Sequence, residues 1–257
     1  MDLAETYLSD ASPYHLTEAI APQAARSTVA KAHPPVPDYL SRHYWWAYID
    51  PKAVAFFERR WLVNLILLGN YDRLARAAVN KIDVGAGTKV LQIACAYGAL
   101  SPMLAQKTDA ANARLQVVDV LPIQLSNLSK KLGAKSTIQL SCMDSCKLEF
   151  DEDAFDSVLL FFLMHEQPDD VRRRTLKEAY RVLKEGGKLI LVDYSLPSKW
   201  NPFRYFIRMV LRKLEPFALD LWVNDTGSWL PEQLHEKVAA RRTFFAGMYQ
   251  MLEIVKR

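Results

Sequence analysis

The segment Val90–Gly98, together with Asp119, has the residue types and spacing of a nucleotide-binding site. Its first four residues, Val-Leu-Gln-Ile, predict a buried strand, and small residues then let a turn pass close to a ligand. Asp119 ends a second apolar run, so its carboxylate should lie at the tip of the neighbouring strand. A carboxylate there can accept hydrogen bonds from both hydroxyls of a ribose.

The small residues of this segment fall at alternate positions, unlike the GxGxxG glycines of dinucleotide-binding enzymes. Alternate spacing resembles the first loop of the class I S-adenosylmethionine (SAM)-dependent methyltransferases, which usually reads acid-x-Gly-x-Gly-x-Gly. On that pattern Gln92 takes the place of the acid, Ala94 and Ala96 replace two glycines, and Gly98 remains. The resemblance implies that the neutral Gln92 lies near the amino group of SAM. It would hold that group more weakly than an acid and leave it freer to react.

Two aromatic segments, His43–Tyr48 and Trp61–Tyr71, narrow the resemblance. With the altered loop they resemble the rhodoquinone-biosynthesis (RquA) family over residues 38–257, a family related to the ubiquinone and menaquinone C-methyltransferases. The resemblance implies that ubiquinone is converted to rhodoquinone, an amino group from SAM replacing a methoxy group, with a divalent metal, manganese. Two other functions stay open: a SAM-dependent quinone C- or O-methyltransferase, and a non-catalytic SAM-fold subunit that binds quinone.

Polar residues also follow two further predicted strands. Asp144 resembles the family position that contacts the adenine amino group, although a solvated acid that caps its own turn fits as well. His165 and Glu166 follow an apolar strand, where they could serve acid/base chemistry or hold a metal through imidazole nitrogen and carboxylate oxygen. A His-Glu pair before a proline is also a common helix start. We take this pair and Gln92 as candidate catalytic residues, and the pair alone as candidate metal ligands.

The predicted cofactor site combines these loops with an aromatic residue that the resemblance adds. Tyr71 corresponds to a position near the methionine part of SAM, although a tyrosine at a helix junction also fits simple packing. The predicted SAM-binding residues are Tyr71, Gln92, Ala94, Cys95, Tyr97, Gly98, Asp119, Val120, Met143, Asp144, Ser145 and Phe162.

Strand and helix patterns alternate through the middle of the chain and predict an α/β fold. We expect a doubly wound, mostly parallel sheet of the seven-stranded type found in class I methyltransferases, with helical lids. A helix should run from Pro51 to a break at Gly69, and the tail 242–255 should add an antiparallel strand or hairpin. The predicted strands are 89–94, 115–118, 137–140, 157–162 and 188–192, and the predicted helices between them are 100–107, 122–132 and 169–184.

The length of 257 residues, half of them hydrophobic, suits one large core with elaborations. Residues 1–37 predict a mobile N-terminal extension, because they carry early acids, no continuous apolar core and a final Pro-rich tract. Residues 38–257 predict one SAM-binding domain, with a helical lid at 38–80 and an amphipathic insertion at 195–235. Three cysteines without paired spacing favour free thiols over disulfides or a zinc site.

The insertion contains an apolar stripe, 203–214, beside arginines at 204, 208 and 212. Such a helix can lie on an anionic membrane, or it can pack its apolar side on the sheet and solvate its arginines. A quinone with an isoprenoid tail favours the membrane, so the resemblance implies a peripheral protein on the cytoplasmic side of a bacterial inner membrane, or on the mitochondrial inner membrane of a eukaryote. No apolar run approaches the roughly 20 residues of a spanning helix. Apart from this amphipathic helix, no basic stripe flanks the proposed substrate mouth, so nucleic acid is not an expected partner.

Overall fold

The structure is a computed structural model that describes residues 33–133, 136–231 and 238–257. Residues 33–257 group into one compact unit. Most of the extension predicted at residues 1–37 lies outside the described residues, and so does part of the predicted insertion, at 232–235.

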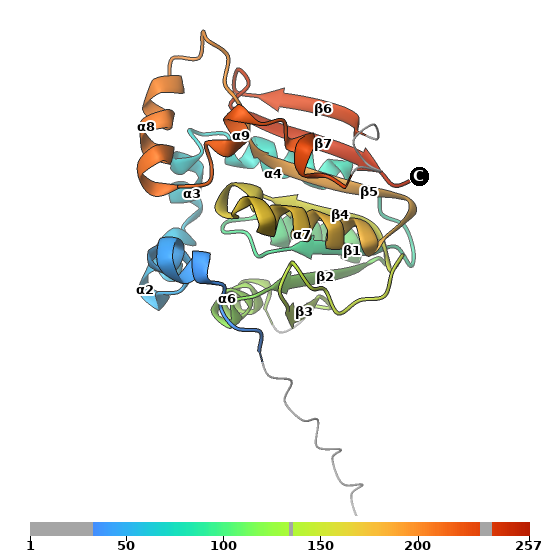
Figure 1. Cartoon of the computed structure of the whole chain (residues 1–257). Coiled ribbons are helices and arrows are strands. Elements are labelled where there is room, and N and C mark those ends of the chain that lie inside the picture. Colours follow the sequence, from blue (N-terminus) through green and yellow to red (C-terminus); the bar gives the residue numbers. More distant parts are fainter. Residues whose placement is uncertain (1–32, 134–135, 232–237) are drawn as a thin grey trace, which may run out of the picture. The chain divides into compact units, whose positions relative to one another are not determined.

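Seven strands in the described residues form a single sheet with the order β3-β2-β1-β4-β5-β7-β6 (Figure 1). The first five are parallel, and β7 pairs antiparallel with both β5 and β6. The predicted fold class, a mostly parallel doubly wound sheet, is therefore confirmed, and the tail forms the predicted hairpin. The strands are β1 Lys89–Ile93, β2 Arg114–Asp119, β3 Gln139–Cys142, β4 Phe155–Phe161, β5 Leu183–Tyr194, β6 Val238–Phe244 and β7 Tyr249–Val255.

Amphipathic helices cover the two faces of the sheet. Figure 1 shows α7 in front of the sheet and α4 behind it, and α5 packs between α4 and α6. Each helix buries one stripe: in α4 the buried residues include Leu74, Ala78 and Val79, at the spacing of one helix face. Strands β1 and β4, which lie inside the sheet, are apolar and buried along almost their whole length. The helices are α4 Tyr71–Lys81, α5 Leu100–Ala110, α6 Pro122–Leu132 and α7 Asp169–Arg181.

The N-terminal segment forms several short helices instead of the single helix expected from Pro51 to Gly69. Asp50 caps α2, because its carboxylate accepts hydrogen bonds from the backbone N–H groups of Lys52 and Ala53. The chain then breaks at Arg59, which is extended, before α3 begins. The elements are η1 Leu40–Tyr44, α1 Trp45–Tyr48, α2 Pro51–Phe57 and α3 Arg60–Ile66.

The insertion after β5 is helical, as predicted. It contains α8 Arg204–Leu214, α9 Asp220–Val223 and a short 3-10 turn, Thr226–Trp229. Figure 1 shows α8 and α3 along the same edge of the unit, where the carboxyl ends of the central strands lie. No helix in the described part of the chain has both the length and the apolar character needed to cross a membrane.

Candidate active site

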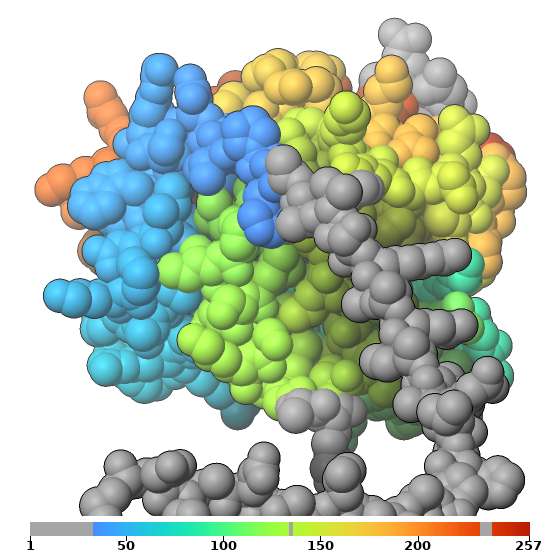
Figure 2. All heavy atoms as spheres, turned by 90° about the horizontal axis from the view of Figure 1, so that it is seen from below, coloured from blue at the N-terminus to red at the C-terminus, as the bar shows by residue number. Residues whose placement is uncertain are grey.

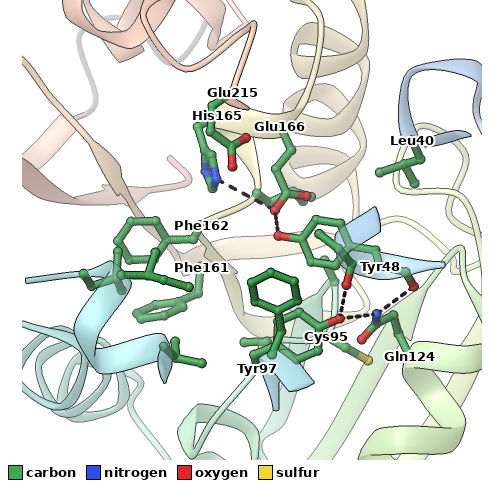
Figure 3. A pocket seen from close by; sticks show the side chains of 18 of the residues that line it. Leu40, Tyr48, Cys95, Tyr97, Gln124, Phe161, Phe162, His165, Glu166 and Glu215 are labelled. Atoms are coloured by element: carbon green, nitrogen blue, oxygen red, sulfur yellow. Dashed lines mark hydrogen bonds and ion pairs between the residues drawn. The ribbon is translucent and has the colours of Figure 1, made fainter. Parts of the chain in front are cut away.

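A cavity of about 580 Å³ lies beyond the carboxyl ends of β1, β2 and β4 (Figure 3). Ligands in open α/β sheets bind at this edge, because the loops that leave neighbouring strands diverge there. Residues of α1, α3 and α8 close the cavity on the other sides. Figure 3 shows Tyr97, Cys95 and Gln124 at one end of the pocket, and His165, Glu166 and Glu215 at the other.

The loop after β1 is shaped by Tyr71, which packs beneath it. The Tyr71 hydroxyl donates a hydrogen bond to the carbonyl of Tyr97 and accepts one from the N–H of Leu100, both at 2.8 Å. Gly98 has a positive φ of 79°, and a Cβ at this position would come within 2.8 Å of the Tyr71 ring. Only glycine both adopts a positive φ without strain and lacks the Cβ that would clash with Tyr71. This is a physical reason for the glycine that remains in the loop. Tyr71 lines the cavity as well.

Asp119 joins the β1 and β2 loops. One of its carboxylate oxygens accepts the N–H of Cys95, and the other accepts the N–H of Leu121, each at 2.8 Å. Each oxygen keeps a further lone pair, so the carboxylate can still receive the two hydroxyls of a ribose. Burial raises the pKa of Asp119 to about 6, although these hydrogen bonds oppose the shift. The geometry suits the predicted ribose contact.

A clamp that the sequence did not indicate holds the same loop. Glu58, just after α2, accepts hydrogen bonds from the N–H of Gly98 at 3.1 Å and from Asn127 and Lys131 at 2.6 Å each. Lys131 also donates to the carbonyl of Gly98, at 2.9 Å. The lid is thereby tied to the loop, and the ring of Tyr48 stacks on Tyr97 with centroids 5.6 Å apart. An isolated glutamate at a helix end carries no sequence signal for this role.

A buried cluster of ionisable groups lies at the far end of the cavity (Figure 3). His165 and Glu166 belong to a 3-10 turn, η2 Met164–Glu166, directly after β4. The His165 Nδ1 atom is 3.1 Å from a carboxylate oxygen of Asp193, and its Nε2 atom is 3.8 Å from Glu166 Oε1. The Tyr48 hydroxyl donates a hydrogen bond to Glu166. Glu215, at the end of α8, lines the same space.

Burial and neighbouring charges shift the pKa values of two groups in this cluster. Burial lowers the pKa of His165, but the charge and hydrogen bond of Asp193, together with the charges of Glu215 and Glu166, outweigh burial and raise it to about 9. Burial raises the pKa of Glu166 to about 8, against the opposing charge of His165. A carboxyl group with such a pKa can accept or release a proton at neutral pH. The cluster is therefore suited to proton transfer.

The predicted metal site does not match the geometry of this cluster. No group of three or more His, Cys, Asp and Glu side chains is arranged to hold an ion among the residues described. The Nδ1 atom of His165 is directed at Asp193, which leaves only Nε2 beside Glu166. A pair of donors falls short of the six oxygen and nitrogen ligands typical of manganese. We derive no chemical step through a metal, and manganese stays a prediction.

Most of the predicted site residues line this one cavity, but three do not. Gln92 is fully buried beneath the loop, where its amide nitrogen donates to the Ala94 carbonyl and to Ser101 Oγ, both at 2.9 Å. Asp144 caps its own turn through the N–H of Cys146, and Gly98 faces Tyr71. The predicted residues that line the cavity are Tyr71, Ala94, Cys95, Tyr97, Asp119, Val120, Met143, Ser145, Phe162, His165 and Glu166.

Comparison with known proteins gives a family match for part of the chain and solved structures of similar fold. A family model described as a methyltransferase domain matches residues 90–187. A putative SAM-dependent methyltransferase from Methanococcus maripaludis superposes with a TM-score of 0.53 at 18% identity, over 80% of this chain and 93% of that one. The chain has the class I SAM-dependent methyltransferase fold.

Several sequence relatives of this methyltransferase-fold protein have names that refer to quinone methylation. A demethylmenaquinone methyltransferase of Streptomyces avermitilis is 32% identical over 63% of this chain and 66% of its own length. A ubiquinone/menaquinone biosynthesis C-methyltransferase of a Geobacter species is 31% identical over 53% of this chain and 58% of its own length. The chain thus spans less than two thirds of the length of each of these two relatives. These matches support a class I SAM-dependent transferase, while the narrower resemblance to rhodoquinone-biosynthesis proteins stays a prediction.

We expect the affinity for SAM to rise with pH through the pKa of Asp119. The ribose hydroxyls donate hydrogen bonds, so SAM prefers the ionised carboxylate, which is the minor form below about pH 6. Between about pH 5 and pH 7 the ionised fraction rises from about a tenth to nine tenths, so affinity should rise about tenfold. Calorimetric titration of SAM at both pH values measures this change. Asp119→Asn, which does not titrate, should abolish the dependence, and an equal slope in the variant would contradict the assignment.

Proposed function

We propose that this protein is a SAM-dependent transferase that modifies the ring of a prenylated quinone, and that it transfers a methyl group to a ring carbon. The main support for the proposal is the set of residues that line the cavity. It runs from a nucleotide-type end at Ala94 and Asp119 to the ionisable cluster around Glu166, with apolar walls from α3 and α8. The quinone methyltransferases among its relatives support the substrate class.

Each part of the cavity has a counterpart in such a pair of substrates. The ribose of SAM fits Asp119, and the adenine fits the space between Val120 and Met143. The quinone ring fits beside Phe162 and Glu166, where aromatic side chains can pack on a flat ring. The apolar walls suit an isoprenoid tail, because they exclude water from a chain that has no polar groups.

Methyl transfer to carbon needs an electron-rich ring, which the reduced hydroquinone provides. Glu166, when ionised, accepts the proton of a ring hydroxyl, and the ring carbon then attacks the methyl group of SAM. A carbon–carbon bond forms, the bond between sulfur and methyl breaks, and S-adenosylhomocysteine leaves. The proton on the attacked carbon is then lost to restore the aromatic ring. The Tyr48 hydroxyl, bonded to Glu166, keeps the carboxylate directed at the substrate.

Amino transfer is the second candidate, and Gln92 is the observation that favours it. Residue 92 does not line the cavity, so an acid there would favour the protonated amino group of SAM through its charge, from beneath the loop; the neutral Gln92 has no such effect. The free amine can attack the ring carbon that bears a methoxy group of ubiquinone, and methanol leaves. Tautomerisation then reduces the quinone ring to a hydroquinone, while the bond between the nitrogen and the α-carbon of SAM becomes an imine. Hydrolysis of the imine releases the α-keto acid and leaves the amino group on the reduced ring, which is the hydroquinone form of rhodoquinone.

Incubation of the purified protein with SAM and a prenylated quinone, supplied both oxidised and reduced, tests the proposal. We expect a new quinone whose formation needs both SAM and the protein. If SAM stabilises the protein against heat but no new quinone forms, the proposal is wrong. The result would then favour the other function, a non-catalytic subunit that binds quinone.

A further inference from the structure

Helix α3 has an unusual composition for its surroundings. Its sequence, Arg-Trp-Leu-Val-Asn-Leu-Ile, is mainly apolar, yet no residue of the helix is buried. Trp61 and Leu65 are both more than half exposed. An apolar helix in a soluble protein normally buries a stripe against its own core, so α3 presents its apolar surface to something else.

The segment around α8 repeats this feature. Trp200 is 92% exposed, and Tyr205 and Met209 are 76% and 62% exposed. Ile207 and Leu211, on the inner side of the helix, are buried, so the helix is held in place while its outer side stays apolar. In the described residues, every exposed large apolar side chain except Val36 and Val223 lies on α1 to α3 or in the segment 196–214.

Both apolar segments carry positive charge and no acid. Residues 59–66 contain two arginines, of which Arg60 pairs with Asp72 at 2.7 Å. Residues 196–214 contain five basic residues without any aspartate or glutamate. The basic residues Arg208, Arg212 and Lys213 are exposed beside the exposed apolar side chains of α8. Apolar side chains flanked by basic residues are complementary to the acyl region and the anionic headgroups of a bilayer. A protein partner would need acidic groups matched to each of these positions.

The same surface contains the mouth of the cavity. Leu65 and Ile66 of α3 line the cavity and are also exposed on the outside, and so are Phe206 and Leu214 of α8. A side chain can do both only where the wall of the cavity is thin or open. Figure 2, from below, shows α8 in orange projecting on the same side as the blue and cyan N-terminal helices. The cavity therefore opens between two apolar, basic helices.

We propose that α3 and α8 form a docking surface for an anionic lipid bilayer, and that the cavity opens into the bilayer between them. This inference rests on the proposed function for the nature of the substrate: the ring of a prenylated quinone enters here and its tail stays among the acyl chains. The exposed tryptophans Trp61 and Trp200 lie at the depth of the headgroups, where indole rings are favoured.

The test uses sedimentation of the whole protein with vesicles of phosphatidylcholine alone or with added phosphatidylglycerol. We expect binding to the anionic vesicles, and a loss of about tenfold or more in Arg208→Gln/Arg212→Gln/Lys213→Gln, because each basic residue near such a surface contributes to binding. Trp61→Ser/Trp200→Ser should lose binding to both vesicle types. None of these residues lines the cavity. The matched control, Lys130→Gln/Lys147→Gln/Lys177→Gln, removes three exposed positive charges elsewhere and should bind like the parent.

Activity measured on two substrates separates this inference from the proposed function. Both docking variants should lose activity on a long-tailed quinone embedded in vesicles and keep it on a short-tailed quinone in solution. If the parent protein modifies neither quinone, the proposed function fails, whatever the vesicles show. A parent that does not bind anionic vesicles, or that modifies both substrates equally well in every variant, would overturn the docking surface. Concentration-dependent dimers that the tryptophan variant abolishes would show that a second copy covers it instead.

Discussion

Glu166→Gln is expected to lower kcat for ring modification by about 10²- to 10⁴-fold, the range of a lost general acid or base. Gln has nearly the same shape, but it cannot exchange a proton with the substrate. Glu166 is the ionisable group that faces the cavity with a pKa shifted to about 8, so the parent should lose activity at pH values below that pKa if the carboxylate acts as a base. Initial rates with SAM and a soluble quinone across pH measure both effects.

The control for this variant is Glu185→Gln, which makes the same change at an exposed position of β5. It should leave the rate and its pH profile unchanged. SAM affinity should be similar in all three proteins, because Cys95 and Tyr97 of the β1 loop lie at the other end of the cavity (Figure 3) and Asp119 is bonded to Cys95. A Glu166→Gln protein that is folded, binds SAM and reacts at the parent rate would remove Glu166 from the chemistry.

Gln92→Glu is expected to distinguish the two reactions. Residue 92 does not line the cavity, so a carboxylate there acts on the amino group of SAM through its charge, from beneath the β1 loop. An opposite charge within about 4 to 6 Å raises the pKa of an amino group by about 1 to 3 units, so the reactive free amine becomes about 10- to 1,000-fold scarcer. Amino transfer should fall by that factor. Methyl transfer should change little, because the sulfonium keeps its charge in either case. Rates of formation of the two products, separated by mass, give the answer.

The substitution also disturbs the structure, because the Gln92 amide donates to the Ala94 carbonyl and to Ser101. Gln92→Met removes both hydrogen bonds without adding charge, whereas the carboxylate of Gln92→Glu can still accept one from the Ser101 hydroxyl. The difference between the two variants therefore reports the charge together with that hydrogen bond. If both variants lose the product to the same extent, position 92 acts only by holding the loop, and the argument for amino transfer fails.

The alternating core could be predicted from the sequence because its signals are local. Apolar runs such as Val90–Ile93 give the strands, and helical periodicity gives the helices between them. The rule that ligands collect at the carboxyl ends of strands then placed Asp119, His165 and Glu166 on one cavity. The same rule, applied to the end of β5, would have found Asp193, which the sequence analysis missed.

The helical lid was predicted, but its internal breaks and its contacts with the loop could not be, because contacts between distant residues determine them. The sequence pattern predicted one helix from Pro51 to Gly69, but the helix is interrupted at Arg59. The preceding residue, Glu58, forms hydrogen bonds with Gly98 and Lys131. These partners are 40 and 73 residues away along the chain. Gln92 was expected at the cofactor for its place in the loop pattern. Its burial beneath the loop reflects a local preference of its amide for the Ala94 carbonyl, which no spacing rule indicates.

The most direct test of the account follows the atoms of SAM into the quinone. The purified protein is incubated with SAM carrying ¹³C in its methyl group and ¹⁵N in its amino group, together with a prenylated quinone in oxidised or reduced form, and the quinone is then analysed by mass spectrometry. The account predicts a SAM-derived label on the ring: ¹³C for the proposed methyl transfer, or ¹⁵N with loss of methoxy for the second candidate. A quinone recovered without either label, from protein that binds SAM, would contradict it.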